Sequence, residues 1–133
     1  MIKSESTKSI LSEETIEIKN FQENNKDYLH FGFQNKFTDL NSVRATDVWS
    51  KYCDENPDKK FIHIWDCQGM TGFDNSAKKR WMDCMDRYSA QTEKIILVSD
   101  NILIRGAARL MSKVTKHKLS VYKAVSEMII AEI

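Results

Sequence analysis

The order of hydrophobic and polar residues predicts strands and helices that alternate from residue 15 onward. Residues 15–21 and 28–33 alternate apolar with polar side chains, which is the pattern of half-buried strands. Asn24 and Asn25 lie between them, and Asn tolerates the left-handed backbone of tight turns. We therefore expect an antiparallel hairpin here.

Later segments are apolar almost throughout. Residues 61–66 and 95–98 have the composition of buried parallel strands. Gly69 and Gly72 follow the first of them, so we expect a turn between this strand and the next helix. Leu119–Tyr122 predicts a last short strand.

Apolar side chains at helical spacing predict four helices. The first follows Ser42 and ends at Asn56, because Pro57 disfavours the helical state before it. The others cover residues 76–89, about 101–115 and 126–133. The side chains expected to face the core are, in order, Ala45, Val48, Trp49 and Tyr52; Ala77, Trp81, Cys84, Met85 and Tyr88; Leu103, Ala107, Leu110 and Val114; Met128, Ile129 and Ile133.

The resulting order, β-β-α-β-α-β-α-β-α, predicts a mixed α/β (α+β) fold. We expect one mixed, mostly parallel sheet of about five strands with packed helices. Right-handed crossovers place consecutive helices on one side of the sheet unless the strand order reverses. Residues 1–13 lack periodicity, so we expect a flexible N-terminal tail before a single domain over residues 14–133.

Composition narrows the classes of partner and compartment. The formal net charge of +1 gives no global attraction to nucleic acid. Neither a secretory signal nor a run of about 20 apolar residues is visible, so we expect a cytoplasmic protein without a transmembrane segment. Cys53, Cys67 and Cys84 are too widely spaced for a zinc pattern, which indicates reduced thiols, with Cys67 and Cys84 buried.

Candidate chemistry is sparse. His63 and Cys67 share one face of a strand but lie about 13 Å apart along it, which favours two packed residues over a catalytic pair. Asp66, Asp74 and Asp100 follow strands at the edge where open α/β sheets bind ligands. Helix capping and turn bonding explain these carboxylates better than a metal site does. We therefore predict no catalytic residue, cofactor or metal.

Two stretches, residues 65–77 and 98–109, together with the order of elements, resemble a STAS-type domain. This is the fold of bacterial anti-sigma-factor antagonists, and the likeness is to the divergent SpoIIAA-like branch. Those antagonists carry Asp-Ser-Ser/Thr-Gly where this chain has Asp74, Asn75, Ser76 and Ala77. The resemblance implies a switch at this turn, because in the family a partner kinase, itself the anti-sigma factor, phosphorylates the first Ser and the added charge disrupts docking.

Here the accepting position is Asn75, which has no hydroxyl, so we expect the domain to lack the usual serine phospho-switch. Ser76 offers the remaining hydroxyl of the motif. We interpret the chain as a non-enzymatic regulatory domain of bacterial signalling that binds a regulatory protein, with an anti-sigma-factor-like kinase as one candidate. Monomer and homodimer both stay open. The expected partner-binding residues are Asp74, Asn75, Ser76 and Ala77, with Asp100, Asn101, Arg105 and Arg109 beside them.

Two alternatives remain. The first is a domain that binds a small anionic or lipid-like ligand, with Arg105, Arg109 and the helix N-termini as an anion site. Peripheral contact with lipid belongs to this alternative. The second is an enzyme that uses the acidic edge of the sheet. Along the third helix, Arg105, Arg109 and Lys113 repeat every four residues, and we expect all three to be exposed.

Overall fold

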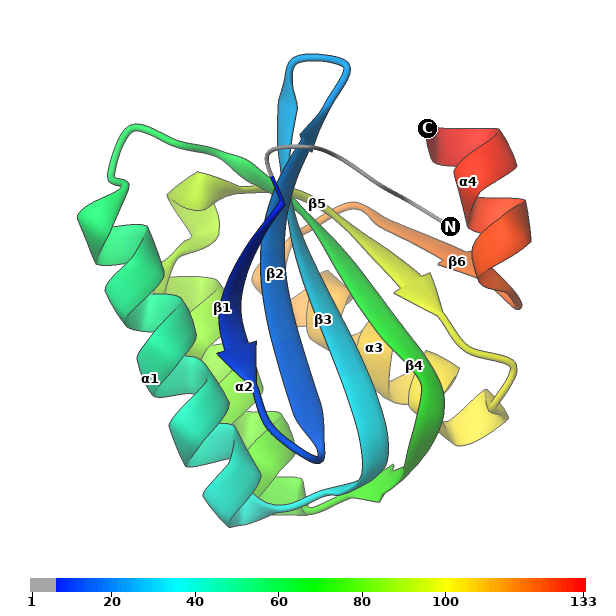
Figure 1. Ribbon diagram of the computed structural model, residues 1–133. Helices are drawn as coiled ribbons and strands as arrows, with labels where there is room; N and C mark the ends of the chain where they lie inside the picture. The colour runs from blue at the N-terminus through cyan, green and yellow to red at the C-terminus, as the bar shows by residue number, and fades with distance from the viewer. Residues whose placement is uncertain (1–6) are drawn as a thin grey trace.

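The computed structural model describes residues 7–133, which form six strands and four α-helices (Figure 1). In chain order these are β1 (Lys8–Ser12), β2 (Ile16–Glu23), β3 (Lys26–Phe37), α1 (Asp39–Glu55), β4 (Phe61–Phe73), α2 (Asn75–Arg87), β5 (Thr92–Val98), α3 (Ile102–Thr115), β6 (Leu119–Tyr122) and α4 (Val125–Glu132). A short 3-10 helix (Ser89–Gln91) precedes β5. The predicted mixed fold is confirmed.

The strands form one sheet in the order β1-β2-β3-β4-β5-β6. The first three are antiparallel and the rest are parallel. The predicted hairpin is confirmed, and Asn24 and Asn25 turn it with φ of 52° and 63°. Such backbone is strained for most residues but open to Asn.

The sheet has six strands, whereas the sequence predicted about five. The extra strand, β1, lies inside the segment expected to be a flexible tail. It pairs with β2 by backbone hydrogen bonds and buries only Leu11 fully, so it carries too little hydrophobic alternation to be detected. Residues 1–6 of the expected tail lie outside the described residues.

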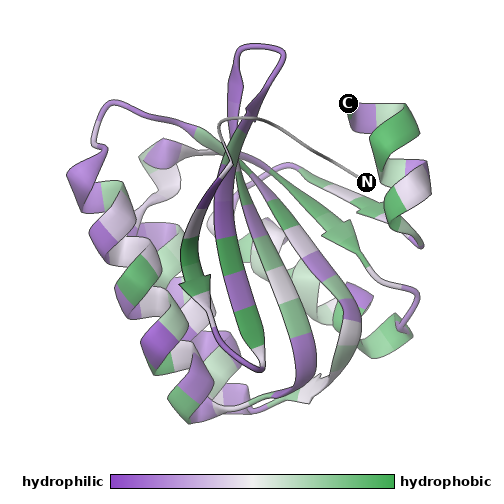
Figure 2. Ribbon diagram, in the orientation of Figure 1, coloured by the Kyte–Doolittle hydropathy of each residue, from purple (hydrophilic) through white to green (hydrophobic). Residues whose placement is uncertain are grey.

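Helices cover the two faces of the sheet unequally. The main core joins α1, α2 and α3 to one face, as right-handed crossovers require, and α4 packs on the other (Figure 1). Strands β2 and β3 alternate hydrophobic and hydrophilic positions, whereas β5, which is packed on both faces, is hydrophobic from Ile95 to Val98 (Figure 2). Met128 of α4 is 1% exposed, and Glu132 accepts a hydrogen bond from Lys94 Nζ at 2.6 Å and another from the Tyr122 hydroxyl.

The predicted turn at Gly69 and Gly72 is wrong, because β4 continues through both residues. Its far end stays paired with β3 as far as Phe37 and Phe73, whereas its pairing with β5 ends at Asp66 and Val98. Gly69 lies against the Gln34 side chain of β3. A Cβ at this position would lie 2.4 Å from Gln34 Oε1, so a larger residue would require the Gln34 side chain to move. Residues 67–73, called the β4 arm here, therefore extend beyond β5 and leave room for α3 to approach.

The predicted inner faces of α1, α2 and α4 are confirmed, but that of α3 is wrong. The core takes Ile104, Ala108 and Met111 from α3. Leu103, Leu110 and Val114, which the spacing placed inside, are 78%, 53% and 58% exposed. The helix carries apolar side chains on more than one side, so periodicity alone could not choose between them.

Candidate functional site

The turn that precedes α2 is tied to the start of α1. Asp74 is the N-cap residue of α2, yet its side chain makes no capping bond there. Instead, Asp74 Oδ2 accepts a hydrogen bond from the backbone N–H of Asp39 at 3.0 Å, and Asp74 Oδ1 lies 3.1 Å from Lys36 Nζ. The Lys36 ammonium and the Asp39 N–H together hold the pKa of the Asp74 carboxyl below its usual value.

Arg80 makes the return contact from α2 to α1. Its Nη2 donates to Asp39 Oδ1 at 3.0 Å, and its Nε donates to Ser42 Oγ at 3.1 Å. Hydrogen bonds from Arg80 and Ser76 lower the pKa of the Asp39 carboxyl. A positive charge near the start of a helix is unfavourable, because it opposes the helix dipole. For Arg80 this cost is offset by its contact with Asp39 at the start of the neighbouring helix α1.

The other residues of the turn differ in exposure. Asn75 is the first residue of α2 and is exposed. Ser76 is exposed as well, and its hydroxyl lies beside the Asp39 carboxylate, whose pKa it helps to lower. Ala77 is fully buried in the main core. Only Asn75 and Ser76 of the motif therefore present side chains to a partner.

The second expected segment leads into α3. Asn101, and not Asp100, caps this helix by accepting from the N–H groups of Leu103 and Ile104 at 2.9 and 3.1 Å. Asp100 is exposed. Arg105 is half-buried, contrary to expectation, because its Nε donates to the Ser99 carbonyl at 2.9 Å.

Arg109 and Lys113 are exposed, as predicted. Neither forms an ion pair within residues 7–133, so both charges are available to a ligand or partner. The sequence grouped Arg105 with Arg109 in one anion site. In the structure the Arg105 side chain instead donates a hydrogen bond to the Ser99 carbonyl, within the connection between β5 and α3.

The solvent side of α3 combines these charges with apolar side chains. We call Leu103, Leu110 and Val114 the apolar stripe, and the stripe with Gly106, Arg109 and Lys113 the outer face of α3. Gly106 is exposed, and outside its own helical backbone a Cβ there would meet no atom of residues 7–133 within 4 Å. A glycine inside a helix costs about 1 kcal/mol relative to alanine. No contact among residues 7–133 explains the glycine at this position.

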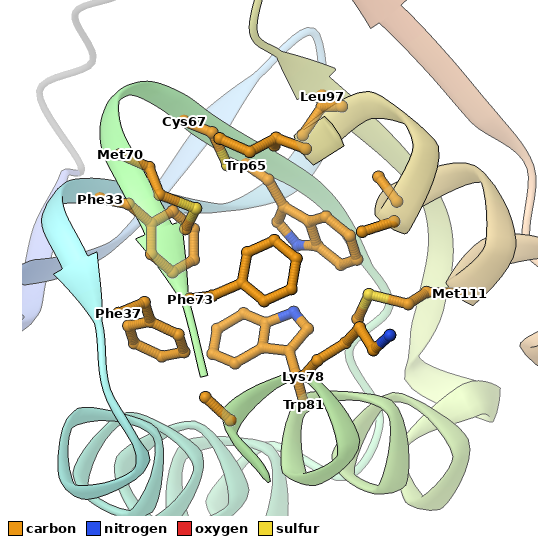
Figure 3. A pocket seen from close by; sticks show the side chains of 14 residues that line it. Phe33, Phe37, Trp65, Cys67, Met70, Phe73, Lys78, Trp81, Leu97 and Met111 are labelled. Carbon is orange, nitrogen blue, oxygen red and sulfur yellow. The ribbon is translucent and has the colours of Figure 1, made fainter. Parts of the chain in front are cut away.

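A small apolar cavity lies between the β4 arm, α2 and α3. It has a volume of about 60 Å³, and the rings of Phe37, Phe73 and Trp81 point into it (Figure 3). Among residues 7–133, Lys78 is the one charged residue that lines the cavity. Ala107 also lines it, next to the side of α3 that carries the apolar stripe. The sequence could not reveal this cavity, because it requires the correct inner face of α3 and the extension of β4.

His63 and the cysteines are packed residues. His63 lies against the Phe31 and Trp49 rings, and its Nδ1 accepts a hydrogen bond from Trp65 Nε1 at 3.3 Å. Burial lowers the pKa of His63 to about 3. All three cysteines are free and buried, as expected for Cys67 and Cys84. Burial raises their thiol pKa values, to about 11 for Cys84.

The acidic edge of the sheet does not come together as a metal site. Asp66 Oδ1 accepts from the backbone N–H of Gln68 at 3.2 Å, and Asp74 is used as described above. Within residues 7–133, no group of three or more His, Cys, Asp or Glu side chains is placed to hold a metal ion. No helix in that part of the chain has the length and apolar content needed to cross a membrane.

Comparison with known proteins places the fold. No protein-family model and no curated protein matches the sequence. An uncharacterized protein of the DUF3478 family from Shewanella loihica, described as having a SpoIIAA-like fold, superposes with a TM-score of 0.71 at 13% identity, over 92% of this chain and 99% of that one. The anti-sigma factor antagonist SpoIIAA in its unphosphorylated form superposes with a TM-score of 0.57 at 13% identity, over 86% of this chain and 94% of that one. The likeness predicted from the sequence is thus confirmed at the level of fold: the chain has a SpoIIAA-like, STAS-type fold.

Proposed function

We propose that this chain is a non-enzymatic regulatory domain that acts by binding another protein through the outer face of α3 and the neighbouring start of α2. The observation that carries the proposal is the apolar stripe, whose three large side chains are each more than half exposed. Contiguous exposed apolar surface on a folded domain is typical of interaction sites. The start of α2 belongs to the same surface, because Lys78 and Ala107 line one cavity.

The turn at residues 74–77, called the switch turn here, supports binding of the partner at all times, without regulation by phosphorylation. Asn75 cannot accept phosphate, and the Ser76 hydroxyl lies beside the Asp39 carboxylate, whose pKa it helps to lower. Asp74 and Arg80 hold the start of α2 against α1. We expect the turn to stay in one conformation and the partner to be free to dock without a phosphorylation cycle. The fold shared with the anti-sigma factor antagonist SpoIIAA is in keeping with this class of role.

Affinity capture from the source cells tests the proposal. The double variant Leu103→Ser/Leu110→Ser removes two of the three side chains of the apolar stripe, and Ile130→Ser is its control, because Ile130 is also exposed but belongs to α4, which packs on the other face of the sheet. A protein retained by the wild type and the control but lost with the first variant is the expected result. Identical sets of captured proteins for all three would contradict the proposal.

A second candidate function is the binding of an apolar molecule with an anionic group, favoured by the cavity and by Lys78 beside it. Small-molecule pockets typically measure about 300–1,000 Å³. The cavity, at about 60 Å³, admits only a few non-hydrogen atoms unless α2 and α3 separate, which is why protein binding is preferred. Native mass spectrometry decides between them. A bound molecule that Ala107→Phe expels would establish this second function.

A further inference from the structure

We infer that the outer face of α3 receives one amphipathic α-helix of a partner protein. The apolar side of that helix would pack on the apolar stripe, and its acidic side would face Arg109 and Lys113. This inference rests on the proposed function and adds the chemistry of the partner. Three features of α3 lead to it: the shape of the stripe, the position of Gly106 and the sign of the charges.

The apolar stripe has the dimensions of a helix–helix contact. Leu110 and Val114 follow Leu103 by seven and eleven residues, so the three side chains fall on one side of the helix. At 1.5 Å per residue the stripe is about 16 Å long, which matches three turns of a partner helix. Apolar residues at this spacing are the usual anchors when a helix docks on a groove or on another helix.

Gly106 lies at the centre of this surface. At 3.6 residues per turn, it points away from the buried side chains Ile104, Ala108 and Met111, between the apolar stripe and Lys113. Apart from its chain neighbours and the backbone of its own helix, no atom of residues 7–133 comes within 4 Å of the position a Cβ would take. Small residues on an exposed helix surface let a second backbone approach closely. A bilayer surface would gain nothing from the missing side chain, so Gly106 favours a helix over a membrane.

Charge selects the kind of helix. The ionisable side chains within α3 are Arg105, Arg109 and Lys113, all basic. Arg109 and Lys113 are exposed and form no ion pair in the described part of the chain, residues 7–133. Pairing of α3 with α3 of a second copy would bring like charges together, which is unfavourable. A helix with Asp or Glu beside its apolar positions complements the surface.

Photo-crosslinking in the source cells tests the inference with the full chain. A photoreactive amino acid replaces Leu110, or Lys113 in a second experiment, and the crosslinked peptide is identified by mass spectrometry. We expect it to come from a segment with apolar residues every three or four positions and acidic residues beside them. In the chain probed at Leu110, Arg109→Glu/Lys113→Glu should reduce crosslinking about tenfold, a loss typical of interface anchors.

Matched variants make the result specific. Lys51→Glu/Lys60→Glu changes the net charge equally at exposed positions elsewhere and should leave crosslinking unchanged. Gly106→Leu should abolish crosslinking, whereas circular dichroism should show a folded protein. Replacing the acidic residues of the captured segment by Lys should restore binding to the Arg109→Glu/Lys113→Glu variant.

Each contrary outcome is distinct. Crosslinks to a second copy, to a segment without acidic residues, or crosslinks that Gly106→Leu leaves unchanged would overturn the acidic helix. Co-sedimentation with phosphatidylserine vesicles that Arg109→Glu/Lys113→Glu abolishes would assign the surface to a membrane. If a partner is captured but docks away from α3, this inference fails and a protein-binding role stands. If no protein is captured from any probe position, both fail.

Discussion

The carboxylate of Asp74 accepts a hydrogen bond from the backbone N–H of Asp39 at 3.0 Å, so the residue before α2 supports the start of α1. We therefore expect Asp74→Ala to lower the urea midpoint of unfolding. Asp74→Asn should lower it less, because the amide oxygen can still accept from Asp39. Lys36→Ala removes only the ion pair and serves as control. Equal losses for Asp74→Ala and Asp74→Asn would show that charge, not the hydrogen bond, holds the two helices together.

Asn75→Asp tests the electrostatics of the switch turn. The substitution adds negative charge in the first turn of α2, where the helix dipole favours it by about 0.3–1 kcal/mol. The free energy of unfolding should hold or rise within that range, whereas a partner docked on the turn should bind more weakly, because the new charge must be desolvated. Urea unfolding and the affinity of the captured partner measure the two effects. A clear loss of stability would contradict this account of the turn.

Phosphopeptide mapping tests the absence of the switch in the native cells. Phosphate on Ser76 would lie beside the Asp39 carboxylate, and the two negative charges would repel each other. We expect Ser76 to carry no stoichiometric phosphate. Stoichiometric phosphate at Ser76 would overturn the constitutive state of the turn.

His63 should make the protein sensitive to acid. Its pKa is lowered from 6.5 to about 3 in the folded protein, because burial disfavours its charged form. The unfolded chain binds a proton below pH 6.5 and the folded one does not. Stability is therefore complete above that pH and falls toward pH 3, by at most about 1.4 kcal/mol per pH unit. Burial lowers the pKa of His30 and His117 as well, and both add to the effect with the same sign.

Urea unfolding between pH 7 and pH 4 measures this dependence. His63→Phe should flatten it, because the ring fills the same aromatic surroundings without a titrating group. His117→Gln, at a partly exposed position, is the control and should flatten it less. A pH dependence unchanged by His63→Phe would mean that the acid sensitivity lies elsewhere.

Truncation of two neighbouring residues tests the orientation of α3. Met111→Ala should cost about 2–5 kcal/mol, since Met111 is buried against the main core. The low end is expected, because Met111 also lines the cavity and part of its surroundings is already empty. Leu110→Ala should change stability by no more than about 0.5 kcal/mol, as is usual for surface positions. A larger loss for Leu110→Ala would mean that α3 is rotated.

Local pattern predicted the strands that alternate or that are apolar throughout. The turn at Asn24 and Asn25 and the cap at Asn101 could also be predicted, because side-chain chemistry decides them locally. The inner faces of α1 and α2 followed from their aromatic residues, among them Trp49 and Trp81.

The features that the sequence did not predict depend on contacts between residues far apart in the chain. Asp74 bonds to Asp39, thirty-five positions away, so its neighbours could only suggest a local cap. Strand β4 passes Gly69 because β3 continues beside it. The face of α3 was settled by packing against the sheet, since both Leu110 and Met111 are apolar. This last error concealed the candidate docking surface.

Thiol labelling at positions 110 and 111 tests the docking surface most directly. The native cysteines are buried and give a low background. Leu110→Cys should react quickly in the isolated protein and become protected when the captured partner is added, whereas Met111→Cys should react slowly in both states. Slow labelling of Leu110→Cys in the isolated protein, or labelling that the bound partner leaves unchanged, would contradict a free outer face of α3 that a partner covers.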